Sequence, residues 1–209
     1  LVLTSGGSYT LGVTNNFYNG LGANGLPPIT STITISGNGA TILRATDYVT
    51  TTFRFFYVAG APTTDIPTGT LTLQDLTLRN GLAQGGDGGA ILNIDNTVTL
   101  TDVRLTGNTA NRGGAVFVST GDAQLDVNRA LFDNNTASEG GAIFGTDPGI
   151  RLNITNATFT GNTGSARGGA VYVDHVALVN STIAGNTSPA AAGVFKNASQ
   201  TFAAINTII

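Results

Sequence analysis

The sequence predicts an all-β fold: a right-handed parallel β-helix in which three-faced coils stack along one axis. Three observations predict it: a repeat of about 25 residues, a period-2 alternation of apolar residues within each copy, and a strand-favouring composition. Thr, Asn, Gly, Val and Ile dominate, whereas Glu139 and Lys196 are the only residues of their types. This balance favours strands and tight turns over helices.

Each copy of the repeat carries Gly-Gly-Ala followed by a β-branched residue. The copies begin at Gly88, Gly113, Gly140 and Gly168, and a degraded copy covers residues 191–194. The strand that follows each Gly-Gly-Ala is expected to form one face of a coil. Gly-rich corners before it allow the sharp change of direction that a coil needs.

Two further short strands precede each Gly-Gly-Ala. In one copy, Leu125 and Val127 alternate with polar residues, and a two-residue gap separates them from Ala130 and Phe132. The alternation predicts strands and the gap predicts a corner, so each repeat forms one triangular coil. A single coil cannot bury its own apolar face, and stacking therefore supplies the core.

We expect one continuous solenoid of about seven or eight coils. Residues 1–66 are predicted to form irregular N-terminal coils, with an excursion from the stack over Asn15–Pro28. Residues 67–209 are predicted to form the regular repeats. No basic segment precedes the apolar start at Leu1, and the sequence ends at Ile209 within an expected strand, so we expect the chain to be a fragment or processed piece of something longer.

Stacking places equivalent residues of successive coils above one another, which predicts two polar ladders. The first is a structural Asn ladder, in which side-chain amides bond from coil to coil: Asn108, Asn135, Asn162 and Asn186. The second is a charge ladder at the position before each Gly-Gly: Asp87, Arg112, Glu139 and Arg167. Its alternating signs make cross-strand pairs that hold the register.

An aromatic ladder follows the β-branched residue of each copy. Its members are Phe117, Phe144, Tyr172 and Phe195. Since strands alternate, we expect the β-branched set to point inward and the aromatic set to lie partly outside, as a possible contact stripe. The alternative is that the aromatic residues form the core stack.

Composition argues against several classes of function. A net charge of -3 and a pI near 4.8 predict no nucleic-acid partner. Without Cys there are no disulfides or thiolate metal sites, and we expect no metal and no cofactor. The apolar runs are far shorter than the roughly 20 residues of a transmembrane helix, so no membrane span is expected.

Two of the copies pair Gly-Gly-Ala with a Phe-x-x-Asn motif, namely Phe132–Asn135 with Gly140–Ile143 and Phe159–Asn162 with Gly168–Val171. This pairing resembles the repeat of chlamydial polymorphic outer membrane proteins, and residues 29–209 are similar to bacterial secreted proteins with pectin-lyase-like β-helix repeats. The resemblance implies an extracellular or cell-surface location and an adhesin-like role. It carries no catalytic residue, and a fold alone does not imply a function.

A carbohydrate-active enzyme is the main alternative, because glycoside hydrolysis needs carboxylates that converge on one bond. The acidic residues fall mostly at turns or in the ladders, and the fragment Tyr172–His175 lacks the Arg motif that a pectate lyase would add. We therefore predict no catalytic residue and a non-catalytic structural or adhesive surface module. A carbohydrate-binding β-helix and an end-to-end filament or sheath subunit remain alternatives. The expected partners are a host or other cell surface, glycans, or further copies joined through coil ends such as Phe202–Ile209.

Overall fold

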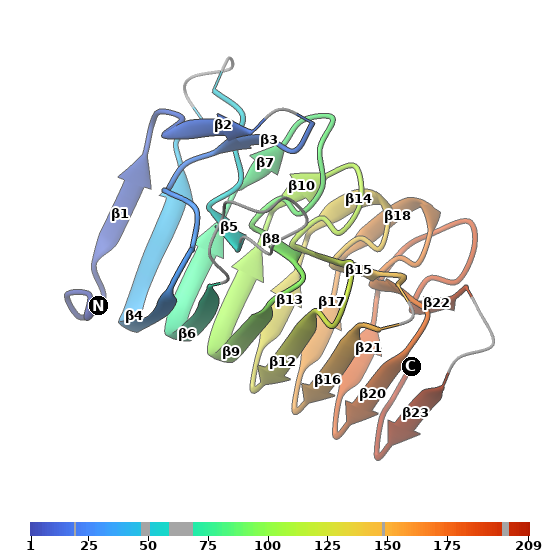
Figure 1. Cartoon of the computed structure of the whole chain (residues 1–209). Helices are drawn as coiled ribbons and strands as arrows, with labels where there is room; N and C mark the ends of the chain where they lie inside the picture. Colours follow the sequence, from blue (N-terminus) through green and yellow to red (C-terminus); the bar gives the residue numbers. More distant parts are fainter. Residues whose placement is uncertain (19, 47–50, 59–68, 148, 198–200) are drawn as a thin grey trace.

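The computed structural model describes residues 1–18, 20–46, 51–58, 69–147, 149–197 and 201–209, which form three parallel sheets, one antiparallel pair of strands and no helix. The strands stack side by side from one end of the molecule to the other as a β-solenoid (Figure 1). It has about five turns, so the expected seven or eight coils are not confirmed, and the handedness stays a prediction. The boundary expected near residue 66 lies outside the described residues.

The first sheet has eleven strands and is bent along its length. Its main path runs through β1 (Ser8–Leu11), β4 (Thr32–Arg44), β6 (Thr70–Arg79), β9 (Thr97–Thr106), β12 (Gln124–Asn128), β16 (Arg151–Thr155), β20 (Val176–Val179) and β23 (Phe202–Ile205). Beyond the bend lie β13 (Leu131–Asp133), β17 (Thr158–Thr160) and β21 (Thr182–Ala184). In β6 and β9 one long strand crosses the bend, and in later coils it is divided in two.

Two smaller parallel sheets close the coils. The second sheet contains β7 (Leu82–Ala83), β10 (Thr109–Ala110), β14 (Thr136–Glu139) and β18 (Thr163–Arg167). The third contains β5 (Phe56–Val58), β8 (Ile91–Ile94), β11 (Val116–Ser119), β15 (Ile143–Gly145), β19 (Val171–Val173) and β22 (Val194–Lys196). Every pairing in these three sheets is parallel, as the stacked repeat requires.

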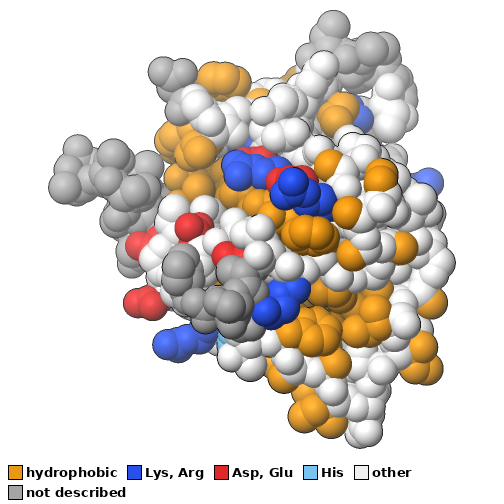
Figure 2. All heavy atoms as spheres, turned by 90° about the vertical axis from the view of Figure 1, so that its right-hand side faces the viewer, with side chains coloured by type: hydrophobic (Ala, Val, Ile, Leu, Met, Phe, Trp, Pro, Cys, Tyr) orange, Lys and Arg blue, Asp and Glu red, His pale blue; other side chains and the backbone are white. Residues whose placement is uncertain are grey.

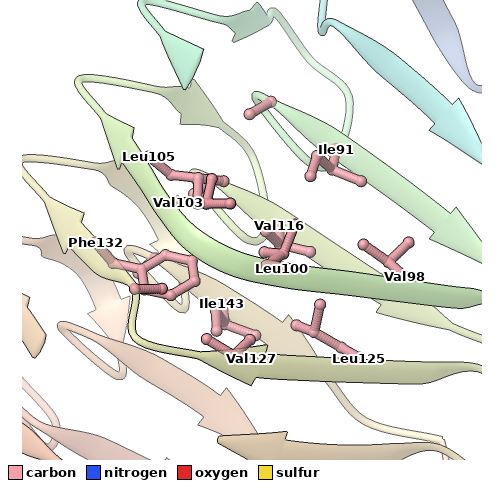
Figure 3. Packing of buried hydrophobic residues seen from close by; sticks show 14 of the residues in the cluster. Ile91, Val98, Leu100, Val103, Leu105, Val116, Leu125, Val127, Phe132 and Ile143 are labelled. Carbon is pink, nitrogen blue, oxygen red and sulfur yellow. The ribbon is translucent and has the colours of Figure 1, made fainter. Parts of the chain in front are cut away.

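The main core fills the space between the sheets. Inward side chains of the first sheet, such as Val98 and Leu125, face the β-branched residues of the third, such as Val116 and Ile143 (Figure 3). All four are fully buried. Burial of each such side chain stabilises the fold by roughly 1.5–3 kcal/mol relative to exposure. The inward placement of the β-branched set agrees with the expectation from alternation.

The bend in the first sheet is made by residues in the left-handed backbone region. Asp75, Asp102, Asn156 and Asn180 have φ between 49° and 55°, and Arg129 has a φ of 54°. Asn and Asp tolerate this region because their short side chains bond to nearby backbone, whereas Arg has no such compensation. Arg129 instead donates two hydrogen bonds, each 2.7 Å long, to the Asp102 carboxylate in the preceding coil.

Each residue of the Gly-Gly-Ala motif is required at its position for a different structural reason. The first glycine needs a positive φ, which is 61° at Gly140. The second has no room for a side chain, because a Cβ on Gly141 would lie 2.1 Å from the carbonyl oxygen of Gly169 in the next coil. The alanine, Ala142, is fully buried in the core. The motif is therefore the seam where adjacent coils approach most closely.

The segment Asn15–Pro28 contains an antiparallel hairpin formed by β2 (Asn16–Tyr18) and β3 (Gly22–Asn24). The fully buried Arg54 anchors it, because its guanidinium donates to the Leu21 carbonyl, to Asn24 Oδ1 at 2.8 Å and to the Asp87 carbonyl at 3.1 Å. Burial lowers the pKa of Arg54 to about 10, so the side chain stays charged at neutral pH.

Candidate functional site

The four Asn residues at one corner form a continuous hydrogen-bonded column. In each step one Oδ1 accepts two bonds from the preceding Asn. Asn135 Oδ1 accepts from the backbone N–H and from Nδ2 of Asn108, both at 3.0 Å. Asn162 Oδ1 does the same for Asn135, and Asn186 Oδ1 for Asn162. The column runs in one direction, with every acceptor facing the coil before it.

Each side-chain amide in the column also donates a hydrogen bond to a backbone carbonyl of the preceding coil. Asn135 Nδ2 donates to the Leu105 carbonyl at 2.9 Å, and Asn162 Nδ2 donates to the Phe132 carbonyl at 2.9 Å. Asn108, Asn135 and Asn162 are fully buried. Their amide groups therefore form hydrogen bonds within the protein, as buried amides must if burial is not to cost free energy. These residues offer little to an external ligand.

The charged residues before the Gly-Gly seam form two separate pairs. Arg112 binds both oxygens of Asp87, at 3.0 and 2.6 Å, and Arg167 Nη1 lies 3.7 Å from Glu139 Oε1. Arg112 and Glu139 occupy facing positions in a backbone bridge. All members are partly exposed, so each pair contributes modestly to stability, about 1 kcal/mol or less.

The aromatic ladder is stacked as expected but is buried. Phe117, Phe144 and Tyr172 are only 4–5% exposed, and Phe195 is intermediate. The expectation of an exposed contact stripe is therefore wrong for the first three rings. Neighbouring rings stack with centroids 4.9–5.2 Å apart and nearly parallel planes, so each ring covers the next.

The guanidinium groups of two arginines lie over rings of the aromatic ladder. The Arg112 guanidinium lies 4.8 Å from the Phe117 ring centroid and 5.1 Å from that of Phe144, and Arg167 lies 5.5 Å from that of Phe195. Seen from the side of the C-terminal coil, basic and acidic side chains lie against one another beside hydrophobic ones (Figure 2). The aromatic ladder is thus a second core outside the main one.

The outer face of the first sheet beyond the bend carries exposed charged and polar side chains. Two hollows lie there, of about 430 and 340 Å³, and both are lined by Thr77 and Arg104. The first also borders on Asp102, Arg129 and the bend itself, and the second extends to residues farther along the strands. We name this surface the polar strip. It consists of Asp75, Thr77, Arg79, Asp102, Arg104, Thr106, Arg129, Leu131, Asp133 and Asn156.

Ion pairs fix two of the carboxylates in the polar strip. Arg104 binds both oxygens of Asp133, at 2.9 and 2.8 Å, and Thr106 donates to the same carboxylate at 2.9 Å. Burial alone would raise the pKa of Asp133, but these hydrogen bonds and the Arg104 charge outweigh it and lower the pKa. The hydrogen bond from Arg129 likewise lowers the pKa of Asp102. Both groups are held as carboxylates, which accept hydrogen bonds and do not donate a proton.

The described part of the chain contains no cluster of three or more His, Asp or Glu side chains that could hold a metal ion. No helix in that part is long and apolar enough to cross a membrane. Among the described residues, the large exposed hydrophobic ones are Leu1, Val2, Val13, Phe17, Phe202, Ile205, Ile208 and Ile209, and none of them lines the polar strip.

The polar strip was not identified from the sequence. Its members come from several coils, at the bend and beyond it, so no short motif contains them. One signal was present, because Asp75, Asp102, Arg129, Asn156 and Asn180 recur at the corner position of the repeat. That recurrence indicated the bend but could not show how Arg104 and Asp133 pair beside it.

Two stretches, residues 129–146 and 156–174, match the family model of the Chlamydia polymorphic membrane protein repeat. They contain the Gly-Gly-Ala seams at Gly140 and Gly168 and two members of the Asn column, Asn135 and Asn162. No curated protein and no solved structure was found to match the chain. The matched repeats coincide with the regular coils of the solenoid.

Proposed function

We propose that this chain, a β-helix repeat protein like the chlamydial polymorphic membrane proteins, is a non-catalytic structural and adhesive module of the cell surface. The repeat indicates a surface or outer-membrane protein with a β-helix fold. The adhesive role is the finer part of the proposal. A solenoid suits it, because each coil contacts only its neighbours and the outer faces form one long surface.

The state of the carboxylates is the observation that carries the non-catalytic part. A glycosidase needs one carboxylic acid that can donate a proton, and its pKa must be raised for that purpose. In the polar strip, Asp102 and Asp133 are bound by Arg129 and Arg104, and their pKa values are lowered. The buried Asn column likewise has its donors and acceptors engaged within the fold.

The adhesive proposal is tested with beads that carry the folded chain. Beads coated with the chain are expected to attach to cultured animal cells or to other bacteria, and beads coated with the heat-denatured chain are not. Equal attachment of the two bead types would contradict the proposal. The non-catalytic part is tested separately by incubation with a panel of polysaccharides. Release of new reducing ends or unsaturated sugars would overturn it.

A further inference from the structure

The polar strip has the composition of a binding surface for an uncharged polar ligand. Its charged residues are three arginines and three aspartates, Arg79, Arg104, Arg129, Asp75, Asp102 and Asp133. The formal charges therefore cancel. A polyanion such as a nucleic acid or a sulfated glycan requires an excess of basic residues, and the strip has none.

A protein partner fits the polar strip poorly. Strong protein interfaces are centred on large apolar or aromatic anchors that fill pockets. The two hollows of the strip are lined by no aromatic residue; of the large apolar side chains there, Leu76 and Val103 are buried and Leu131 is only partly exposed. The large exposed hydrophobic residues of the described chain lie elsewhere. What the strip offers instead is a dense set of hydrogen-bonding groups.

We propose that the polar strip binds a neutral glycan chain that lies along the solenoid axis, and this inference rests on the adhesive function proposed above. Guanidinium groups of Arg104 and Arg129 are about half exposed, at 51% and 52% of the side chain, and each keeps N–H donors beyond its ion pair. Arg129 and the 47% exposed Asp102 present a planar donor and acceptor set that suits the adjacent hydroxyls of a sugar ring. Arg104 offers donors alone, because its partner Asp133 is buried and accepts bonds from within the fold.

The spacing of the coils supports the orientation of the glycan. Successive strands lie about 4.8 Å apart, so equivalent strand positions follow one another along the axis at a distance close to the length of one sugar unit. The side chains at these positions differ from coil to coil, as Thr77, Arg104 and Leu131 do. The two hollows adjoin at Thr77 and Arg104, which makes a track across several coils. An oligosaccharide placed along this track meets a fresh set of hydroxyl, amide and ion-paired groups at each coil. Affinity should therefore rise with chain length.

The test uses the full chain and an array of defined oligosaccharides of one to six sugar units. The neutral probes are oligomers of glucose, mannose and N-acetylglucosamine, and the charged probes are heparin and polysialic acid fragments. We expect binding to at least one neutral series, with affinity that rises with length, and weak binding to the charged probes. Preference for heparin, or no binding to any neutral series, would overturn the proposal.

Variants locate the site. Arg129→Gln and Arg104→Gln are expected to weaken binding of the neutral probe about tenfold each, as loss of a charged hydrogen-bonding group does. Arg129 is the cleaner test because its partner Asp102 is exposed and tolerates its loss. Arg151→Gln, an exposed position on β16 outside the polar strip, is the matched control. Unchanged binding in Arg129→Gln, with the circular dichroism spectrum preserved, would place the ligand elsewhere.

The two proposals can fail separately. If coated beads attach to cells while no neutral probe binds, the adhesive function stands and the glycan site is wrong. If the neutral probes bind through Arg129 but the beads do not attach, the polar strip is a glycan site and the adhesive function is wrong.

Discussion

At the scale of single residues, the Asn column contributes more to this fold than its small number of members suggests. The side chain of Asn135 has four hydrogen bonds to groups in the two adjacent coils, two through Oδ1 and two through Nδ2. Any substitution there leaves partners unsatisfied on both sides. Because those partners are buried, water cannot replace the lost bonds.

We expect Asn135→Ala to lower the free energy of unfolding by about 3 kcal/mol or more, since several buried groups lose their partner at once. Urea denaturation followed by circular dichroism measures the change. Asn153→Ala is the control, because Asn153 is exposed and donates only to Asp126. Similar midpoints for the two variants would show that the column is not a major source of stability.

The Asp133 ion pair predicts a dependence of stability on pH. The pKa of Asp133 is lower in the folded chain than in the unfolded chain, so its contribution is present above the unfolded pKa and is lost as pH falls through the folded pKa. Asp133→Asn should therefore be less stable than the natural chain at pH 7, and the gap should narrow below about pH 4. Thermal unfolding from pH 7 to pH 2 measures it. A constant gap over that range would refute this account.

At the scale of elements, the sequence predicted most strands, but it did not predict which side chains cover their outer faces. The spacing of Gly-Gly-Ala and of the apolar pairs placed the repeats in register, as the pairing of Val116 with Ile143 shows. Alternation also predicted the inward β-branched set. It could not show that Arg112 would lie over Phe117 and Phe144, because that depends on the reach of a side chain from another part of the coil.

The hairpin of β2 and β3 was expected only as an excursion from the stack. Its sequence is rich in Gly and Asn, which predicts turns but does not predict which residue of the solenoid the hairpin binds. The buried Arg54 supplies that partner, through the Leu21 carbonyl and Asn24 Oδ1. A single charged residue in an otherwise apolar stretch gave no sequence signal for this role.

We expect Arg54→Met to release the hairpin while the later coils stay folded. Methionine keeps the bulk but removes the donors that hold Leu21, Asn24 and Asp87. Backbone amides of residues 16–24 should exchange with deuterium about tenfold faster, because local opening becomes easier. Exchange in β16 and β20 should not change. Unaltered exchange over 16–24 would mean that backbone bonds alone hold the hairpin.

At the scale of the whole molecule, the solenoid is a one-dimensional array. Each coil contacts only its neighbours, so damage to one coil weakens those beside it most. The Gly-Gly seam makes this testable, because a Cβ on Gly141 would lie 2.1 Å from the Gly169 carbonyl oxygen. Backbone must move to accommodate it.

We predict that Gly141→Ala destabilises the protein by about 2 kcal/mol or more through this overlap. Faster hydrogen exchange should appear in β14, β15, β18 and β19 and should fade toward β4. Gly193→Ala is the matched control, since its nearest contact is the movable side-chain atom Ile209 Cγ2 at 2.8 Å. Equal acceleration over all strands would show that the array unfolds as a single unit.

The direction of the Asn column has a consequence for how the chain is assembled. A coil that has already folded presents a backbone N–H and an amide Nδ2 that point toward the next coil, as Asn108 does toward Asn135. An incoming Asn has only to supply one oxygen to close both bonds. The column therefore has a polarity: a folded coil offers two donors to the coil that follows it and one acceptor to the coil before it, so the stack can be extended at either face.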